Sequence, residues 1–128
     1  MSAKNIAMVL GVVFIVIGIL GFVGGLSVVG EGGFFPTDTV HDVIHLVSGL
    51  ILVFVAMKSM GSLSMTLKVL GIIYLLVTIL GFVVGEGMVL GLFNTNMSDN
   101  ILHLVLAVLL LWGGFMGNKG GNMMSSSM

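Results

Sequence analysis

One apolar segment occurs twice in this chain, as GVVFIVIGILGFVGG at residues 11–25 and as GIIYLLVTILGFVVG at residues 71–85. Neither copy contains a charged residue, and each lies within a run long enough to cross a bilayer, which takes about 20 apolar residues. A second such run follows each copy. The four candidate spans are residues 5–25, 40–57, 66–85 and 98–116. Continuous apolar runs form helices rather than barrel strands, so the sequence predicts an all-α integral membrane protein.

The composition agrees with a membrane protein and excludes several other classes. Of the 128 residues, 58% are hydrophobic and only 7% are charged, whereas about a quarter of the residues of a soluble domain are charged. The net charge of −1 and the lack of a basic cluster argue against nucleic acid as a partner. The chain contains no cysteine, which excludes disulfides, thiolate metal sites and a cysteine nucleophile. The expected partners are the lipid bilayer and, within it, further copies of the chain or a larger membrane complex.

Lysines and carboxylates fall on opposite sides of the four spans. The lysines are Lys4, Lys58, Lys68 and Lys119, and the carboxylates in or beside the two other connections are Glu31, Asp38, Asp42, Glu86 and Asp99. Short segments that carry lysine stay in the cytoplasm by the positive-inside rule. We therefore expect both termini and the 58–68 connection inside, and the two acidic connections outside.

The repeat extends beyond the two apolar copies. After a two-residue gap, GFFPT at residues 33–37 aligns with GLFNT at 91–95, and VHDVIHLV at 40–47 aligns with SDNILHLV at 98–105. The chain is therefore predicted to consist of two tandem helical hairpins. Each hairpin crosses the membrane twice, so both copies insert in the same orientation and a pseudo-two-fold axis along the membrane normal relates them.

The two hairpins, over about 5–58 and 66–116, are expected to form one antiparallel four-helix bundle within residues 1–117. Residues 118–128 are rich in glycine, serine and methionine and show no periodic pattern, so we expect a disordered cytoplasmic tail there. Small residues recur at helical spacing in the first and third spans, where close approach of backbones drives helix association in lipid. They are Gly18, Gly21 and Gly25 in the first copy, and Thr78, Gly81 and Gly85 in the second.

Histidines occupy equivalent positions of the two copies. His45 and His103 each lie about five residues inside the outer end of a span, and an ionisable residue at that depth in a membrane indicates a functional site. Each has polar neighbours three and four residues earlier, on the same helix face. These neighbours are His41 and Asp42 in the first copy and Asp99 and Asn100 in the second. If the second and fourth helices approach each other, the histidines of both copies converge near the outer surface.

Three interpretations of these residues stay open. In the first, neutral histidines tie the helices together, Asp42 and Asp99 stabilise helix starts, and no cofactor is bound. In the second, His45 and His103 are axial ligands of a haem b between diagonal helices. The third is a zinc or copper site, because histidines four apart on a helix present two nitrogens to one ion. Its ligands would be His41, His45 and His103 with Asp42 or Asp99.

No catalytic constellation accompanies these residues. No serine or threonine is accompanied by a base and an orienting group, and no glycine-rich phosphate loop occurs. We therefore expect a non-enzymatic structural, self-associating or accessory membrane component with no catalytic residue. A haem b or metal-binding membrane protein is the alternative.

Several segments resemble one family of small four-helix membrane proteins of bacteria and archaea, catalogued as domain of unknown function 4383. The resemblance covers about residues 9–114 and is most specific in VHDVIHLVSG at 40–49 and NTNMSDNILHLVLA at 94–107. It implies the four-helix topology, a place in the plasma membrane of a prokaryote and the importance of the histidine segments, but no activity. The chain departs from the family pattern at His41–Asp42, where an asparagine-containing pattern is more usual, and at Ala107, where glycine is more usual.

Overall fold

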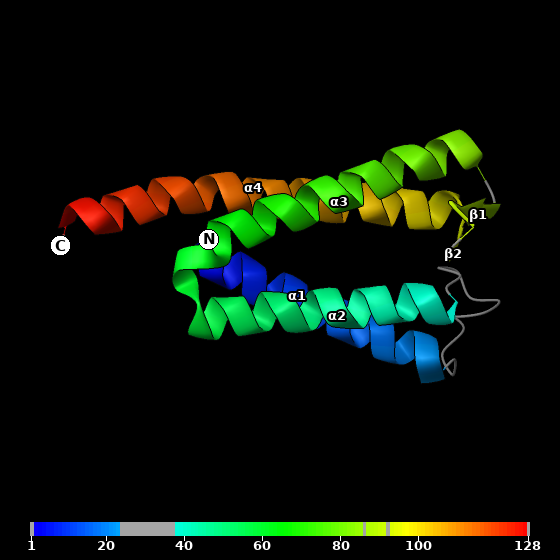
Figure 1. Cartoon of the computed structure of the whole chain (residues 1–128), viewed down its shortest axis with the longest axis horizontal. Coiled ribbons are helices and arrows are strands. Elements are labelled where there is room, and N and C mark those ends of the chain that lie inside the picture. The colour runs from blue at the N-terminus through cyan, green and yellow to red at the C-terminus, as the bar shows by residue number, and fades with distance from the viewer. Residues whose placement is uncertain (1, 24–37, 86, 92, 128) are drawn as a thin grey trace.

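The four candidate spans are helices in the structure, a computed structural model that describes residues 2–23, 38–85, 87–91 and 93–127. The helices are α1 (Ala3–Val23), α2 (Thr39–Lys58), α3 (Leu63–Val84) and α4 (Met97–Ser127), with a short 3-10 helix, η1 (Met60–Ser62), between α2 and α3 (Figure 1). Each of the four α-helices is long and apolar enough to cross a membrane. The predicted all-α membrane bundle is therefore confirmed.

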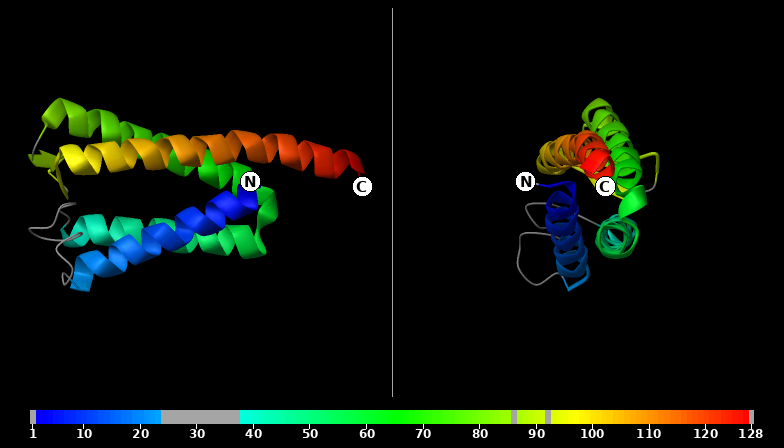
Figure 2. Two further views of the ribbon diagram at one scale, coloured as in Figure 1. Left: turned by 180° about the vertical axis from the view of Figure 1, so that it is seen from behind. Right: turned by 90° about the vertical axis from the view of Figure 1, so that its left-hand side faces the viewer.

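The helices pack as two antiparallel hairpins. α1 packs along α2, and α3 packs along α4. The hairpins meet through α1 against α4 and α2 against α3, as the end-on view in Figure 2 shows. Both ends of the chain lie at the η1 end of the bundle, together with Lys4, Lys58 and Lys68. The connection between α1 and α2, which carries Glu31, lies outside the described residues.

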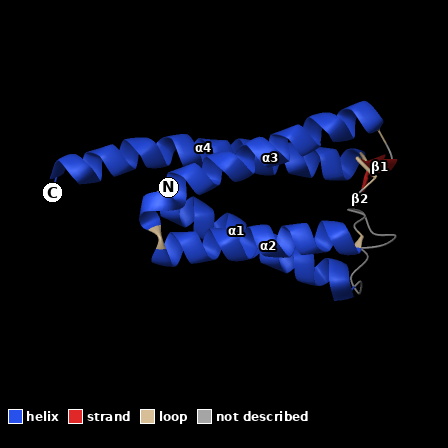
Figure 3. Cartoon of the chain, viewed as in Figure 1, coloured by secondary structure: helices blue, strands red, loops and turns tan. Residues whose placement is uncertain are grey.

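A small β-hairpin at the opposite end of the bundle was not predicted. Strands β1 (Gly87–Val89) and β2 (Phe93–Thr95) pair antiparallel, with Gly87 opposite Thr95 (Figure 3). The backbone reverses through Leu90 and Gly91, whose φ angles are 53° and 70°. Consecutive residues in the left-handed region favour the tight reversal of a hairpin. Strands of three residues are too short to give a periodic sequence signal, which is why the sequence does not reveal them.

Equivalent contacts recur in the two hairpins. The Asp38 side chain accepts a hydrogen bond from the backbone N–H of His41 at 2.9 Å, and 58 residues later Asn96 accepts one from the N–H of Asp99 at 2.9 Å. Each side chain caps the start of its helix. A Cβ atom at Gly21 would overlap the Asp42 carboxylate, and one at Gly81 would overlap the Asn100 amide. The same positions of both copies therefore make the same kinds of contact, as a tandem repeat requires.

The core changes character along the bundle. Towards the η1 end it is apolar and comprises Ile6, Ala7, Leu10, Leu52, Ala56, Leu63, Leu67, Ala107 and Leu110. Towards the β-hairpin end the buried side chains are polar: His41, Asp42, His45, Ser48, Thr78, Thr95, Asp99, Asn100 and His103. Buried polar groups are costly in an apolar medium unless they are partnered. The polar half is therefore the candidate functional region of the bundle.

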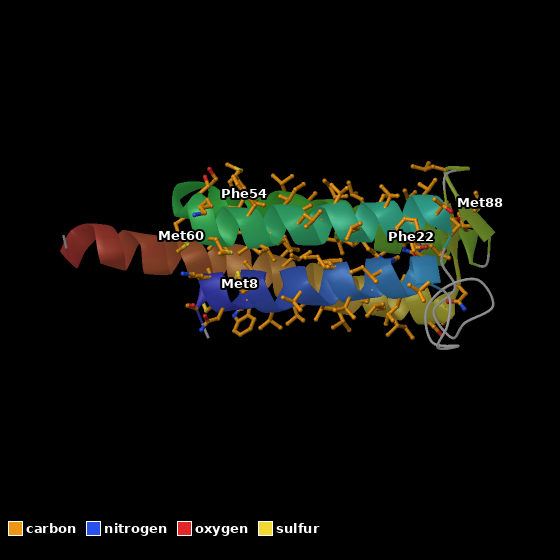
Figure 4. All side chains as sticks on the ribbon, turned by 90° about the horizontal axis from the view of Figure 1, so that it is seen from below. Met8, Phe22, Phe54, Met60 and Met88 are labelled. Atoms are coloured by element: carbon orange, nitrogen blue, oxygen red, sulfur yellow. The ribbon has the colours of Figure 1, made fainter. Side chains whose placement is uncertain are left out.

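Apolar side chains cover the outside of the bundle. Phe22, Phe54, Met60 and Met88 project outward in Figure 4, and 62% of Phe54 is exposed. In a soluble protein so many exposed apolar side chains would form an aggregation-prone surface. Such a surface is compatible with contact to the lipid tails of a bilayer.

Helix α4 continues to Ser127, whereas the sequence predicts a disordered tail over 118–128. The glycines, asparagines and serines of this stretch have low intrinsic helix propensity. The candidate span within α4 ends at Met116. The division of the chain at residue 117 and the disorder of the tail stay predictions.

Replacing Gly49 by alanine is expected to destabilise the α1–α2 hairpin. The new Cβ would lie 2.6 Å from the Gly11 carbonyl oxygen and 2.8 Å from the Ile15 amide nitrogen, and backbone atoms cannot move aside as side chains do. Overpacking of this kind costs about 1–3 kcal/mol. Gly61→Ala is the matched control, because nothing lies within 4 Å of a Cβ at that position. Thermal unfolding in detergent should separate the two variants, and equal melting temperatures would contradict the predicted helix contact.

Candidate metal centre

The starts of α2 and α4 position three histidines. Asp38 caps α2 three residues before His41, and His45 follows one turn later on the same face. Asn96 caps α4, and His103 lies four residues after Asp99. At 1.5 Å per residue, His45 and His103 lie about 9 Å from the first residue of their helices. Both helices start at the β-hairpin end, so the histidines lie at one level of the bundle.

The three imidazole rings form one cluster. The Nε2 atoms of His41 and His103 lie 3.1 Å apart in a hydrogen bond in which either ring can donate. The ring centroids of His41 and His45 are 4.4 Å apart, and those of His45 and His103 are 5.8 Å apart. One nitrogen from each ring can be chosen so that all three lie within 4.8 Å of one another. Two nitrogens bound to one tetrahedral zinc ion are about 3.3 Å apart at the usual Zn–N length. The cluster is therefore close to the size that one ion requires.

The histidines are buried and incompletely hydrogen-bonded. His41, His45 and His103 are only 1–2% exposed. Among the described residues, neither ring nitrogen of His45 has a hydrogen-bond partner, and neither does Nδ1 of His103. An unpartnered buried polar atom costs about 1–3 kcal/mol, so such atoms are rare in native proteins. In particular, neither a hydrogen-bond donor nor an acceptor is described for the two ring nitrogens of His45.

Aromatic rings close the cluster on the side of the apolar core. The Phe14 ring lies 5.8 Å from the His45 ring and 5.0 Å from the Tyr74 ring, measured between centroids. Tyr74 in turn lies 5.9 Å from the ring of His103. Its hydroxyl forms a 3.0 Å hydrogen bond with the hydroxyl of Ser48. Phe14 and Tyr74 are equivalent residues of the two repeats, 60 positions apart.

Sequence reasoning did not identify Phe14, Ser48 or Tyr74 as lining residues. The available signal was the Tyr74 hydroxyl, because a polar group in the middle of a spanning segment needs a partner. The pairing of Phe14 with Tyr74 in the repeat alignment was a second signal. Neither reveals which helix face is buried, since these spans are apolar all round.

The two aspartates of the predicted site occupy different surroundings. The Asp42 carboxylate packs against Gly21 on α1, in the place that the Asn100 amide takes against Gly81 on α3. Asp99 is 1% exposed, and its Oδ2 atom has no hydrogen-bond partner among the described residues. Neither aspartate belongs to the group of ligand atoms that lie within 4.8 Å of one another. The structure therefore brings His41, His45 and His103 together and leaves Asp42 and Asp99 outside that group.

The hydrogen bond between Ser48 and Tyr74 is expected to stabilise the packing of α2 against α3 beside the cluster. Interhelical hydrogen bonds in membrane proteins contribute about 1 kcal/mol. Tyr74→Phe and Ser48→Ala each remove one partner and keep most of the side-chain volume. A double-mutant cycle from thermal or denaturant unfolding should give a coupling free energy of about that size. Strictly additive effects would show that the two hydroxyls do not interact.

A family model described as "Domain of unknown function (DUF4383)" matches residues 4–116, which include all four spans and the histidine cluster. No curated protein and no solved structure matches the chain.

Proposed function

Since the chain belongs to the family described as domain of unknown function 4383, whose description gives no activity, we propose from the site itself that this membrane protein holds one transition-metal ion. The ligands are His41, His45 and His103, and the ion is zinc or copper. The observation that carries the proposal is His45, a buried histidine in the cluster whose two ring nitrogens have no hydrogen-bond partner among the described residues. Imidazole nitrogen is a common ligand of both metals.

A metal ion fits the cluster better than the alternative of a haem b bound by His45 and His103. The His41 ring lies against both of these rings, with centroid separations of 4.4 and 5.1 Å. Phe14 and Tyr74 fill the adjoining space. A porphyrin plane between His45 and His103 would have to displace His41 and these aromatic rings. A single ion requires only that the three nitrogens draw together around it.

A purely structural role for the histidines is the competing account. The hydrogen bond between His41 and His103 favours it, since that bond links α2 to α4. It leaves the polar atoms of His45 without a function, however, and these atoms are costly to bury. Metal binding gives the His45 ring a partner.

We also propose that the site lies near the outer face of a prokaryotic plasma membrane, with both termini in the cytoplasm. The lysines at the η1 end support this orientation by the positive-inside rule. The metal would then exchange with the outside of the cell. Self-association, or a place in a larger membrane complex, stays a prediction.

Metal analysis tests the proposal directly. Protein purified in mild detergent without chelators should retain about one zinc or copper ion per chain, or take up one equivalent of Zn²⁺ in a calorimetric titration. Metal bound to the folded state should also raise the melting temperature, because a ligand at a hundred times its Kd adds about 2.7 kcal/mol. Protein that takes up no metal and melts at the same temperature with and without Zn²⁺ would leave the histidines with the structural role.

A further inference from the structure

The charge of the proposed site is unbalanced if histidines are its only ligands. Three neutral imidazoles leave the full double charge of a divalent ion inside a low-dielectric bundle, where an uncompensated charge is costly. The chain has four basic side chains, all lysines, and all lie in the segments of the opposite end. Two carboxylates, Asp42 and Asp99, are buried at the level of the histidines. A cation bound between the histidines and these buried carboxylates would compensate each other's charge.

The internal two-fold relation distinguishes Asp99 from Asp42. It exchanges His45 with His103 and His41 with Asp99, since these residues are 58 positions apart. His41 lies against His103, at 3.1 Å between Nε2 atoms. Applied to the contact between His41 and His103, the same operation would place Asp99 beside His45. His45 is the histidine whose nitrogens have no described partner, and Oδ2 of Asp99 also has none among the described residues.

Asp42 has a different counterpart and a different contact. The two-fold relation exchanges it with Asn100, and each of these side chains packs against a glycine of the neighbouring helix, Gly21 or Gly81. A carboxylate and an amide are similar in shape but differ in charge. Because a carboxylate and an amide make the same packing contact at this position, the contact depends on side-chain shape rather than charge. We therefore assign Asp42 to the packing of α1 against α2.

We infer that Asp99 is the fourth ligand of the metal, which makes the site a closed set of three histidines and one carboxylate that selects a divalent ion. This inference rests on the proposed function. It requires the Asp99 side chain to rotate, because its oxygens lie outside the group of atoms within 4.8 Å of one another. Hard oxygen and imidazole ligands favour Zn²⁺ over Cu⁺, which prefers thiolate and thioether sulfur. Four protein ligands also leave no open position for a substrate, as in structural rather than catalytic zinc sites.

The test compares three variants in calorimetric titrations with Zn²⁺. Asp99→Asn keeps the shape of the side chain and removes its charge, and it should weaken zinc binding about a hundredfold, the share of one of four ligands in a structural zinc site. Asp42→Asn is the matched control, with the same chemical change at the neighbouring position, and it should bind zinc within about twofold of the wild type. Asp99→His places a histidine at both of the repeat-equivalent positions 41 and 99, and this variant should keep zinc binding.

Co²⁺ provides a readout that a merely structural role of Asp99 would not change. The visible absorption bands of bound Co²⁺ report its coordination, so Asp99→Asn and Asp99→His should each shift them relative to the wild type, whereas Asp42→Asn should not. Asp99→Asn protein with wild-type zinc affinity and wild-type Co²⁺ bands would overturn the inference but leave the three-histidine site standing. A wild-type protein that binds no Zn²⁺, Co²⁺ or copper would overturn both the inference and the proposed function.

Discussion

Replacing His45 with glutamine is expected to lower the zinc affinity of the protein by about a hundredfold. Structural zinc sites bind with about 10–16 kcal/mol, so each of four ligands accounts for about 3 kcal/mol, and 1.4 kcal/mol is a factor of ten. The same substitution at His103 should have an effect of the same size, because both rings lie in one cluster. Calorimetric titration with Zn²⁺ measures both variants.

The alternative explanation for such a loss is a destabilised bundle. Gly49→Ala controls for it, because it is expected to weaken the α1–α2 contact while all three histidines remain. If Gly49→Ala binds zinc normally and His45→Gln does not, the loss of zinc affinity results from the removal of a metal ligand. Wild-type zinc affinity in His45→Gln would contradict the metal-site account, since no other described group of histidines and carboxylates lies close enough to replace it.

A thiol-labelling experiment is expected to give an all-or-none result for the orientation of the chain. The protein has no native cysteine, so a single introduced cysteine is the only thiol that can react. Met88 in β1 is 45% exposed at the β-hairpin end, and Gly61 in η1 is exposed at the opposite end. A membrane-impermeant maleimide added to intact cells should label Met88→Cys and should leave Gly61→Cys unlabelled until the membrane is opened.

The reverse labelling pattern would show that the chain has the opposite orientation in the membrane. The histidine cluster would then face the cytoplasm, and the metal would come from the inside of the cell. Labelling of both variants in intact cells would contradict the four-span bundle itself. One span, α3, lies between Gly61 and Met88, so the two residues must lie on opposite faces of the membrane.

Much of the fold follows from two features of the sequence, the apolar runs and the internal repeat. The length of the apolar runs determines the number of helices, and the 60- and 58-residue offsets of the repeat relate α1 to α3 and α2 to α4. The same offset predicts that His45 and His103 lie at one level. In the structure they converge across the interior of the bundle, where the His41 ring of α2 contacts the His103 ring of α4.

The rest depends on helix rotation, which these sequences do not specify. α1 is apolar on every face, so nothing in its composition shows that Phe14 points to the histidines while Val13 is exposed. Neighbouring positions on a helix point about 100° apart. Asp99 and Asn100 therefore differ in surroundings although they are adjacent, and the structure shows that Asn100 is the one that packs on Gly81.

X-ray absorption spectroscopy of the zinc-loaded protein identifies the atoms that bind the metal. We expect a first shell of nitrogen and oxygen atoms at about 2.0–2.1 Å, with the outer-shell scattering of three imidazole rings, and fewer rings in His45→Gln. A zinc spectrum without imidazole scattering, or one that His45→Gln leaves unchanged, would contradict the claim that these three histidines hold the metal.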